Sequence, residues 1–104
     1  LNPGYQLVQS GHAIVEFANK HPQPFKDWTE TSNYLISLSV QDENHLKRLY
    51  EKLKWRGANV VAFTEPDIGD QLTAICYYGT PELRKITNKL DLALKNLNYV
   101  QNYV

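Results

Sequence analysis

Residues 4–13 read GYQLVQSGHA, and they are the most informative stretch of this chain of 104 residues. With the residues that follow, they place four polar side chains at spacings i, i+4, i+7 and i+11: Tyr5, Gln9, His12 and Glu16. At about 100° per residue, these four lie on one stripe of an α-helix. Most other positions of this helix are apolar, so we expect the polar stripe to face either solvent or a functional site.

The length and composition predict a single domain spanning residues 1–104. No apolar run approaches the roughly 20 residues that a membrane-spanning helix needs, and no signal-peptide pattern is present. With one cysteine, Cys76, these features indicate a cytoplasmic protein. The formal net charge is zero, so the total shows no basic excess of the kind typical of nucleic-acid binding. A neutral total can still hide a local patch of one sign.

The opening helix is expected to begin after Asn2, an N-cap residue followed by proline, and to run to about Asn19. Two prolines then interrupt it, so residues 20–32 are predicted to form a loop. In that loop we expect Phe25 and Trp28 to fold back onto the core.

Alternating and continuous apolar patterns predict three strands at Tyr34–Val40, residues 59–64 and residues 71–78. An apolar face at spacings i, i+3, i+4 and i+7 predicts a helix over residues 44–56, and a further helix should begin at Thr80. The order indicates an α/β fold of two or three layers, with a small mixed sheet and three main helices. Residues 34–64 should form a strand–helix–strand unit with parallel strands.

Metal and thiol chemistry receive little support. The three histidines, His12, His21 and His45, are scattered and have no cysteine near them, so no metal site and no cofactor are predicted. Cys76 lies in an apolar run, where a buried core thiol is the simpler interpretation. A nucleophilic cysteine would need a base and an electropositive setting.

The helix over residues 44–56 is rich in cations and aromatic rings: Lys47, Arg48, Lys52, Lys54 and Arg56, with Tyr50 and Trp55. A surface that binds nucleic acid has this composition. An ordinary solvated helix face has it too, and cations near a helix C-terminus also complement the helix dipole. Both interpretations stay open at this point.

Three carboxylates, Glu65, Asp67 and Asp70, lie within six residues after an apolar strand. Loops at the carboxyl ends of strands often form sites in α/β proteins, and paired carboxylates can act as acid and base. Acidic residues are also common in turns for purely conformational reasons.

The pattern Gly4-Tyr5-x-x-x-Gln9-x-x-His12-Ala13 resembles the opening helix of the archaeal and eukaryotic type of peptidyl-tRNA hydrolase, which reads Gly-Lys-x-x-x-Gln-x-x-His-Ala. The predicted elements follow in that family's order, and residues 72–75, LTAI, are similar to its late strand. The resemblance covers roughly residues 2–95. It implies a small α/β domain with a mixed sheet of four strands, commonly a homodimer. It also implies hydrolysis of the ester between tRNA and a peptide, without metal or cofactor.

Carried over by position, the resemblance implies a catalytic group of Thr73, Asp67, Glu65 and His12. It also implies that Tyr5 and Gln9 bind the substrate. To these we add Lys52 and Lys54 of the basic helix, on their charge and not on the resemblance. Tyr5 stands where the family has a lysine, and a neutral phenol offers one donor in place of a charge. Three functions therefore remain open: hydrolysis of peptidyl-tRNA, a catalytically inactive module that binds RNA or protein on the same fold, and a small enzyme on this fold with an unrelated small substrate.

The family also has a strand directly before its opening helix. We expect that strand either to precede Leu1 or to be replaced by residues 98–104, which are rich in Tyr, Val and Asn.

Overall fold

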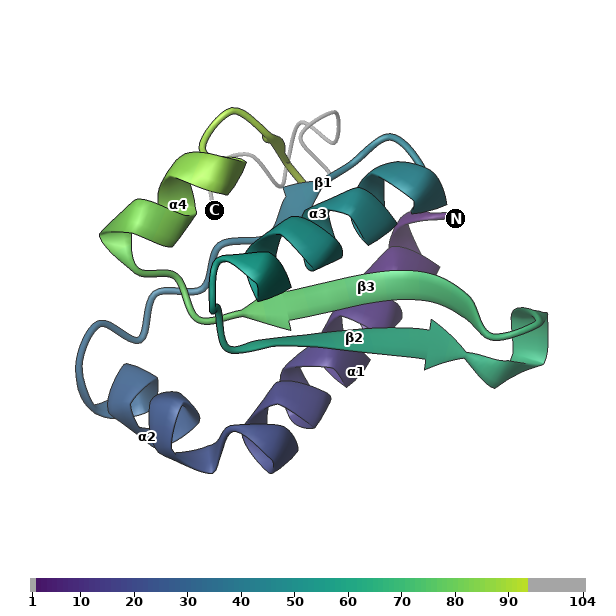
Figure 1. Ribbon diagram of the computed structural model, residues 1–104. Coiled ribbons are helices and arrows are strands. Elements are labelled where there is room, and N and C mark those ends of the chain that lie inside the picture. Colours follow the sequence, from purple (N-terminus) through teal and green to yellow (C-terminus); the bar gives the residue numbers. More distant parts are fainter. Residues whose placement is uncertain (1, 94–104) are drawn as a thin grey trace.

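The computed structural model describes residues 2–93, and its elements are drawn in Figure 1. Helix α1 spans Pro3–Lys20, as predicted to within one residue. Asn2 caps it through a side-chain oxygen that accepts a hydrogen bond of 2.8 Å from the Tyr5 N–H. The expected replacement strand at residues 98–104 lies outside the described residues.

The predicted loop over residues 20–32 is wrong, because Pro22–Glu30 forms a second helix, α2. Both prolines, Pro22 and Pro24, fall in its first turn, where the helix needs no N–H donors. The prolines therefore end one helix and begin the next. The rings of Phe25 and Trp28 contact each other at 5.6 Å between centroids, and both side chains are half-buried.

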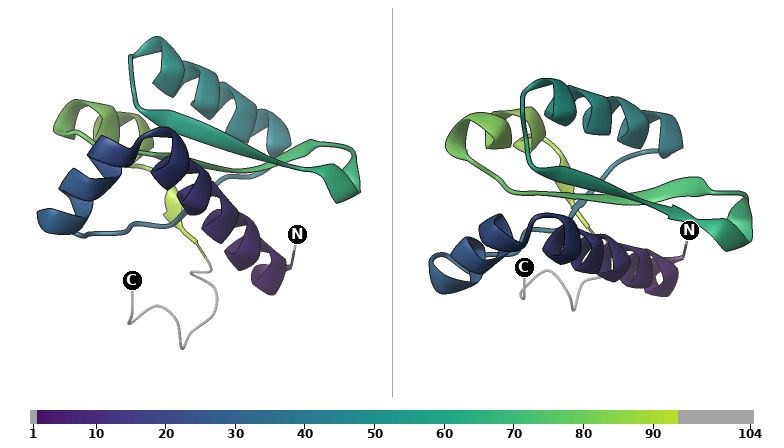
Figure 2. Two further views of the ribbon diagram at one scale, coloured as in Figure 1. Left: turned by 90° about the horizontal axis from the view of Figure 1, so that it is seen from below. Right: turned by 60° about the horizontal axis from the view of Figure 1, so that its bottom comes forward.

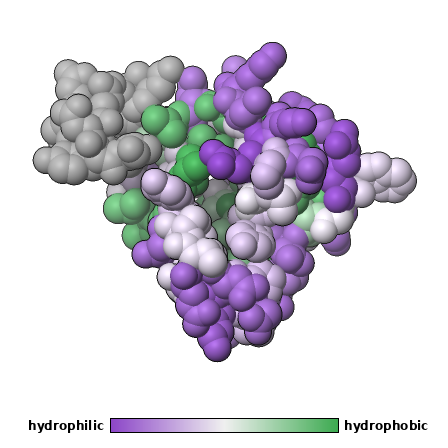
Figure 3. Space-filling model, turned by 90° about the vertical axis from the view of Figure 1, so that its left-hand side faces the viewer, coloured by the Kyte–Doolittle hydropathy of each residue, from purple (hydrophilic) through white to green (hydrophobic). Residues whose placement is uncertain are grey.

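The predicted strand Tyr34–Val40 is also shorter than expected: β1 covers Leu38–Ser39 and pairs antiparallel with β4, Asp91–Leu92. The Ala93 N–H extends this pairing by donating to the Ser37 carbonyl at 2.9 Å. Residues 34–36 are exposed, and the Trp28 ring N–H donates to the Tyr34 carbonyl at 2.6 Å. Figure 3, seen from the side of α2 and α4, shows apolar surface gathered in one area among hydrophilic surface. Alternation thus predicts which backbone is extended, but a strand also needs a partner.

A long hairpin forms the middle layer of the molecule. Its strands are β2, Val60–Glu65, and β3, Gln71–Tyr77, joined by a short 3₁₀ helix, η1, over Pro66–Ile68. Gly69 ends that turn at a φ of 72°, which glycine adopts without strain. Helix α1 lies on one face of the hairpin and α3, Glu43–Trp55, lies on the other (Figure 2).

The α/β class is confirmed, but the arrangement of strands differs from the predicted mixed sheet of four. Within residues 2–93 the strands form two antiparallel pairs, β1 with β4 and β2 with β3. Strands β1 and β2 belong to different pairs, so the predicted parallel strand–helix–strand unit is wrong. The chain folds back after η1 through a short turn, and a short turn favours antiparallel pairing of neighbours.

The predicted helices are confirmed as α1, α3 and α4, Pro81–Thr87. Asp42 caps α3 by accepting from the His45 N–H, and Thr80 caps α4 in the same way from Leu83. The core is built where α1 and α3 meet the hairpin: Ala13, Phe17, Leu53, Val60, Val61 and Leu72. Leu53 has no exposed surface, as the predicted apolar face of α3 requires.

Candidate functional site

Gln9, on the predicted polar stripe of α1, is 2% exposed and faces the hairpin. Its amide nitrogen donates to a carboxylate oxygen of Glu65 at 3.1 Å. Its amide oxygen accepts from the Thr73 hydroxyl at 2.7 Å. The two ends of one buried amide thus join a residue from the end of β2 to a residue of β3. The polar stripe therefore does not face solvent at Gln9, whose side chain faces polar groups of the hairpin.

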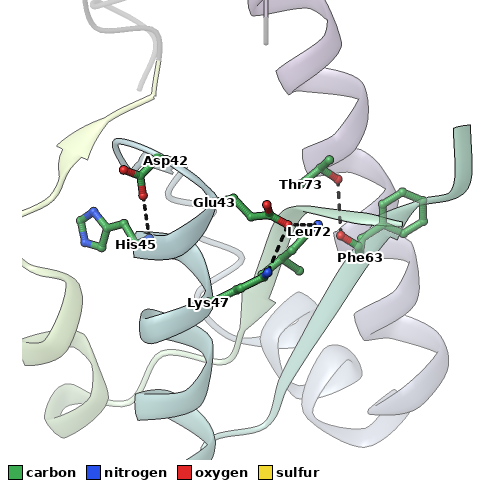
Figure 4. A network of polar contacts seen from close by, with 7 residues as sticks. All are labelled: Asp42, Glu43, His45, Lys47, Phe63, Leu72 and Thr73. Atoms are coloured by element: carbon green, nitrogen blue, oxygen red, sulfur yellow. Dashed lines mark hydrogen bonds and ion pairs between the residues drawn. The ribbon is translucent and has the colours of Figure 1, made fainter. Parts of the chain in front are cut away.

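Thr73 reaches α1 because of an irregularity in the hairpin. Phe63 pairs with Ala74, while the next residue, Thr64, pairs with Leu72, so Thr73 is an extra residue in β3. Such a bulge bends the strand and redirects side chains. The Thr73 hydroxyl also lies 3.4 Å from the Phe63 carbonyl (Figure 4). A hydroxyl has one hydrogen to donate. The amide oxygen of Gln9 is the better acceptor for it, because that contact is the shorter of the two.

Two carboxylates end this row of groups. Glu65 is 9% exposed, and its second oxygen accepts from the backbone N–H of Asp67 at 3.3 Å. Asp67, in η1, is exposed.

Tyr5 lies one helix turn before Gln9 and is half-buried. Partial loss of hydration raises the pKa of its phenol, and the carboxylates of Glu65 and Asp67 raise it further. The phenol therefore stays protonated at neutral pH and can donate one hydrogen bond.

His12 lies beside this group, one turn after Gln9. Its ring stacks on the ring of Phe63, with centroids 4.6 Å apart and planes inclined by 12°. The His12 residue as a whole is exposed, so the edge of the ring can meet a ligand. Sequence reasoning did not single out Phe63. Its alternation with Val61 and Glu65 in a strand could have placed it on the α1 face.

Six residues predicted for the site thus come together on the α1 face: Tyr5, Gln9, His12, Glu65, Asp67 and Thr73. We call them the polar cluster. Lys52 and Lys54, predicted to bind the same substrate, are not brought to it. They are exposed on α3, on the opposite face of the hairpin (Figure 2). The Lys54 ammonium instead lies 5.6 Å from the centre of the Tyr50 ring.

The opposite face of the hairpin carries a second polar network (Figure 4). A carboxylate oxygen of Glu43, in the first turn of α3, accepts from the Leu72 N–H at 2.9 Å and lies 3.6 Å from the Lys47 ammonium. Leu72 directly precedes the bulged Thr73. The bulge is therefore held from both faces, by Gln9 of α1 and by Glu43 of α3.

Other chemistry has no comparable arrangement in the part of the chain that the structure describes. There, no three His, Cys, Asp or Glu side chains are placed to hold a metal ion. Cys76 is free and half-buried, and burial raises the pKa of its thiol to about 11, so it is a neutral thiol at pH 7. Among residues 2–93, no helix combines the length and the apolar character needed to cross a membrane.

Comparison with known proteins agrees with the resemblance seen in the sequence. A search of the curated proteins gave no match. The model of one protein family, described as peptidyl-tRNA hydrolase PTH2, matches residues 1–93. The match covers all the elements described above and the whole polar cluster. The chain therefore belongs to the PTH2 family of peptidyl-tRNA hydrolases.

Proposed function

We propose that this protein hydrolyses the ester bond between a peptide and tRNA at the polar cluster. The observation that carries the proposal is the buried hydrogen-bond chain from Thr73 through Gln9 to Glu65. Here the partners are a hydroxyl and a carboxylate next to further exposed polar groups, as expected for a site that handles water and an ester.

Asp67 is the better general base of the two carboxylates. Both oxygens of Glu65 already accept N–H groups, and its residue is nearly buried. Asp67 is exposed, so its carboxylate can reach a water molecule. In the proposed step, Asp67 takes a proton from water while the water oxygen bonds to the ester carbonyl carbon. The tetrahedral intermediate then releases the ribose oxygen of tRNA, which takes the proton back from Asp67.

In the proposed step, Thr73 orients the attacking water and Tyr5 stabilises the oxyanion. Because the Thr73 hydroxyl gives its hydrogen to Gln9, its oxygen is left as an acceptor that can orient the attacking water. The protonated phenol of Tyr5 supplies one hydrogen bond to the developing oxyanion. The exposed edge of His12, fixed by stacking on Phe63, contacts the substrate end.

The direct test is release of an N-acetylated amino acid from N-acetyl-aminoacyl-tRNA by the purified protein. We expect Thr73→Val to lower kcat by roughly 100-fold, because the variant has no oxygen to orient water. Thr73→Ser keeps the hydroxyl and should stay within about 10-fold of the parent. No turnover by the folded parent protein at high concentration would leave RNA or protein binding as the function of this fold.

Tyr5 offers an independent arm of the same assay. We expect Tyr5→Phe to lower kcat by about 10-fold, through loss of one oxyanion donor. Tyr5→Lys places the family's residue beside two carboxylates and should match or exceed the parent rate. Because its phenol has a raised pKa, Tyr5 should cause no loss of rate with rising pH below pH 10. An unchanged rate in Tyr5→Phe would remove Tyr5 from the mechanism.

The proposed function also implies a cellular process, a location and an oligomeric state. Release of tRNA from peptides belongs to translation, in the cytoplasm, and the family resemblance implies a homodimer. Light scattering of the purified protein measures that oligomeric state directly.

A further inference from the structure

The exposed face of α3 has an unusual composition that the polar cluster does not use. Trp55 is 87% exposed, although tryptophan is among the side chains with most to gain from burial. Arg48 and Lys52 are exposed on the same helix, seven and three residues before it. These spacings place all three side chains on one stripe, since positions seven residues apart differ by only about 20° around the axis.

The cations of this stripe lie outside the ion pairs of the described residues, although Glu51 is exposed on the same helix. Among residues 2–93, the ion pair on α3 joins Lys47 to Glu43 at 3.6 Å, and neither Arg48 nor Lys52 takes part in an ion pair there. By contrast, Lys20 at the end of α1 pairs with Glu16 at 3.4 Å. The apolar residues of α3 meanwhile pack on the hairpin, with Leu53 fully buried. Fold stability therefore does not require the charged stripe.

Helix α4 extends the positive charge. Figures 1 and 2 place it beside the C-terminal end of α3 in every view. Arg84 and Lys85 are exposed on it and line a shallow hollow of about 240 Å³, with Pro81 and Asn88. We call Arg48, Lys52, Trp55, Arg84 and Lys85 the basic face.

We propose that the basic face binds single-stranded RNA, with the cations contacting phosphates and Trp55 stacking on an unpaired base. Sequence-tolerant binding of single strands combines these two elements, a positive track and exposed aromatic rings. An interfacial membrane helix needs an exposed apolar face, whereas Trp55 alone is exposed among the large hydrophobic residues of α3, so we take the occupant to be RNA and not an anionic membrane. This surface lies across the hairpin from the polar cluster, so the proposal stands or falls independently of ester hydrolysis.

The test measures binding of a fluorescein-labelled oligouridylate of 12 nucleotides to the full chain, by anisotropy, at several salt concentrations. We expect Trp55→Ala to weaken binding by about five-fold or more, and Trp55→Phe to restore most of the loss. Arg48→Glu with Lys52→Glu should weaken binding by more than 10-fold and flatten the salt dependence. The matched control is Lys26→Glu, an exposed lysine of α2, which should bind like the parent.

Circular dichroism checks that each variant is folded, and exposed positions make that the expected result. The proposal is overturned if the parent does not bind the oligonucleotide at 50 mM salt. Equal affinity of Trp55→Ala and the parent would overturn it as well. So would equal weakening by Trp55→Ala and Trp55→Phe, or binding of phosphatidylserine vesicles without binding of RNA.

Discussion

The two faces of the β2–β3 hairpin hold their helices through neighbouring residues but with different chemistry. On the α1 face, the buried amide of Gln9 joins Thr73 and Glu65. On the α3 face, the half-exposed carboxylate of Glu43 accepts from the Leu72 N–H. The first arrangement gathers groups that can act on a substrate, and the second ties a helix N-terminus to backbone. One bulge is thus tied to both helices, and substitutions can separate the proposed site from the structural contact.

The largest expected effect comes from Gln9→Glu. It places a carboxylate 3.1 Å from that of Glu65, at a position only 2% exposed. Two like charges with little access to water should lower the free energy of unfolding by about 2–4 kcal/mol. Urea unfolding at pH 7 measures the loss.

The matched control exchanges the partners. In Gln9→Glu combined with Glu65→Gln, an amide again faces a carboxylate, so we expect more than half of the stability to return. Failure of the double variant to recover would show that the Gln9–Glu65 contact does not set the stability of the α1 face.

An intermediate effect is expected from Glu43→Ala, which leaves the Leu72 N–H without its acceptor and removes a negative charge from the first turn of α3. The free energy of unfolding should fall by about 1–2 kcal/mol. Turnover at the polar cluster should stay within about two-fold of the parent, since no reacting group is touched.

Lys47→Ala is the control for this variant, because it removes only the ion pair with Glu43 and should cost less than about 0.5 kcal/mol. A large loss of kcat in folded Glu43→Ala would contradict the separation of the two faces.

The smallest effect at neutral pH concerns Cys76, whose pKa burial raises to about 11. The folded protein keeps the thiol proton over a range in which the unfolded chain, with a pKa near 9, loses it. The contribution to stability is therefore complete below pH 9 and is lost as the pH rises toward 11. Between pH 8 and pH 10.5, the free energy of unfolding measured in urea should fall more steeply for the parent than for Cys76→Ala. Parallel pH profiles would mean that Cys76 does not titrate in this way.

Local signals in the sequence predicted much of the fold. The caps Asn2, Asp42 and Thr80 and the apolar face around Leu53 act within one or two helix turns, so they can be read without knowing the fold. The stretch around Pro22 was misread because proline both ends and begins helices. Pairing could not be read at all, since the partner of Leu38 is Leu92, far along the chain.

The candidate site divides in the same way. The helical stripe and the family resemblance together singled out Gln9, Glu65 and Thr73. Their hydrogen bonds depend on the bulge opposite Phe63 and Thr64. No residue type in either strand predicts that bulge. Lys52 was grouped with them by charge alone, and the hairpin separates it from them.

The hairpin separates groups of opposite charge, although the formal net charge of the chain is zero. Strand β2 begins where α3 ends, near Arg56, and finishes at the carboxylates of Glu65 and Asp67. Six residues of strand separate these ends by about 20 Å. A polyanion such as RNA attracts the end with the cations and repels the end with the carboxylates, so it orients the molecule before contact.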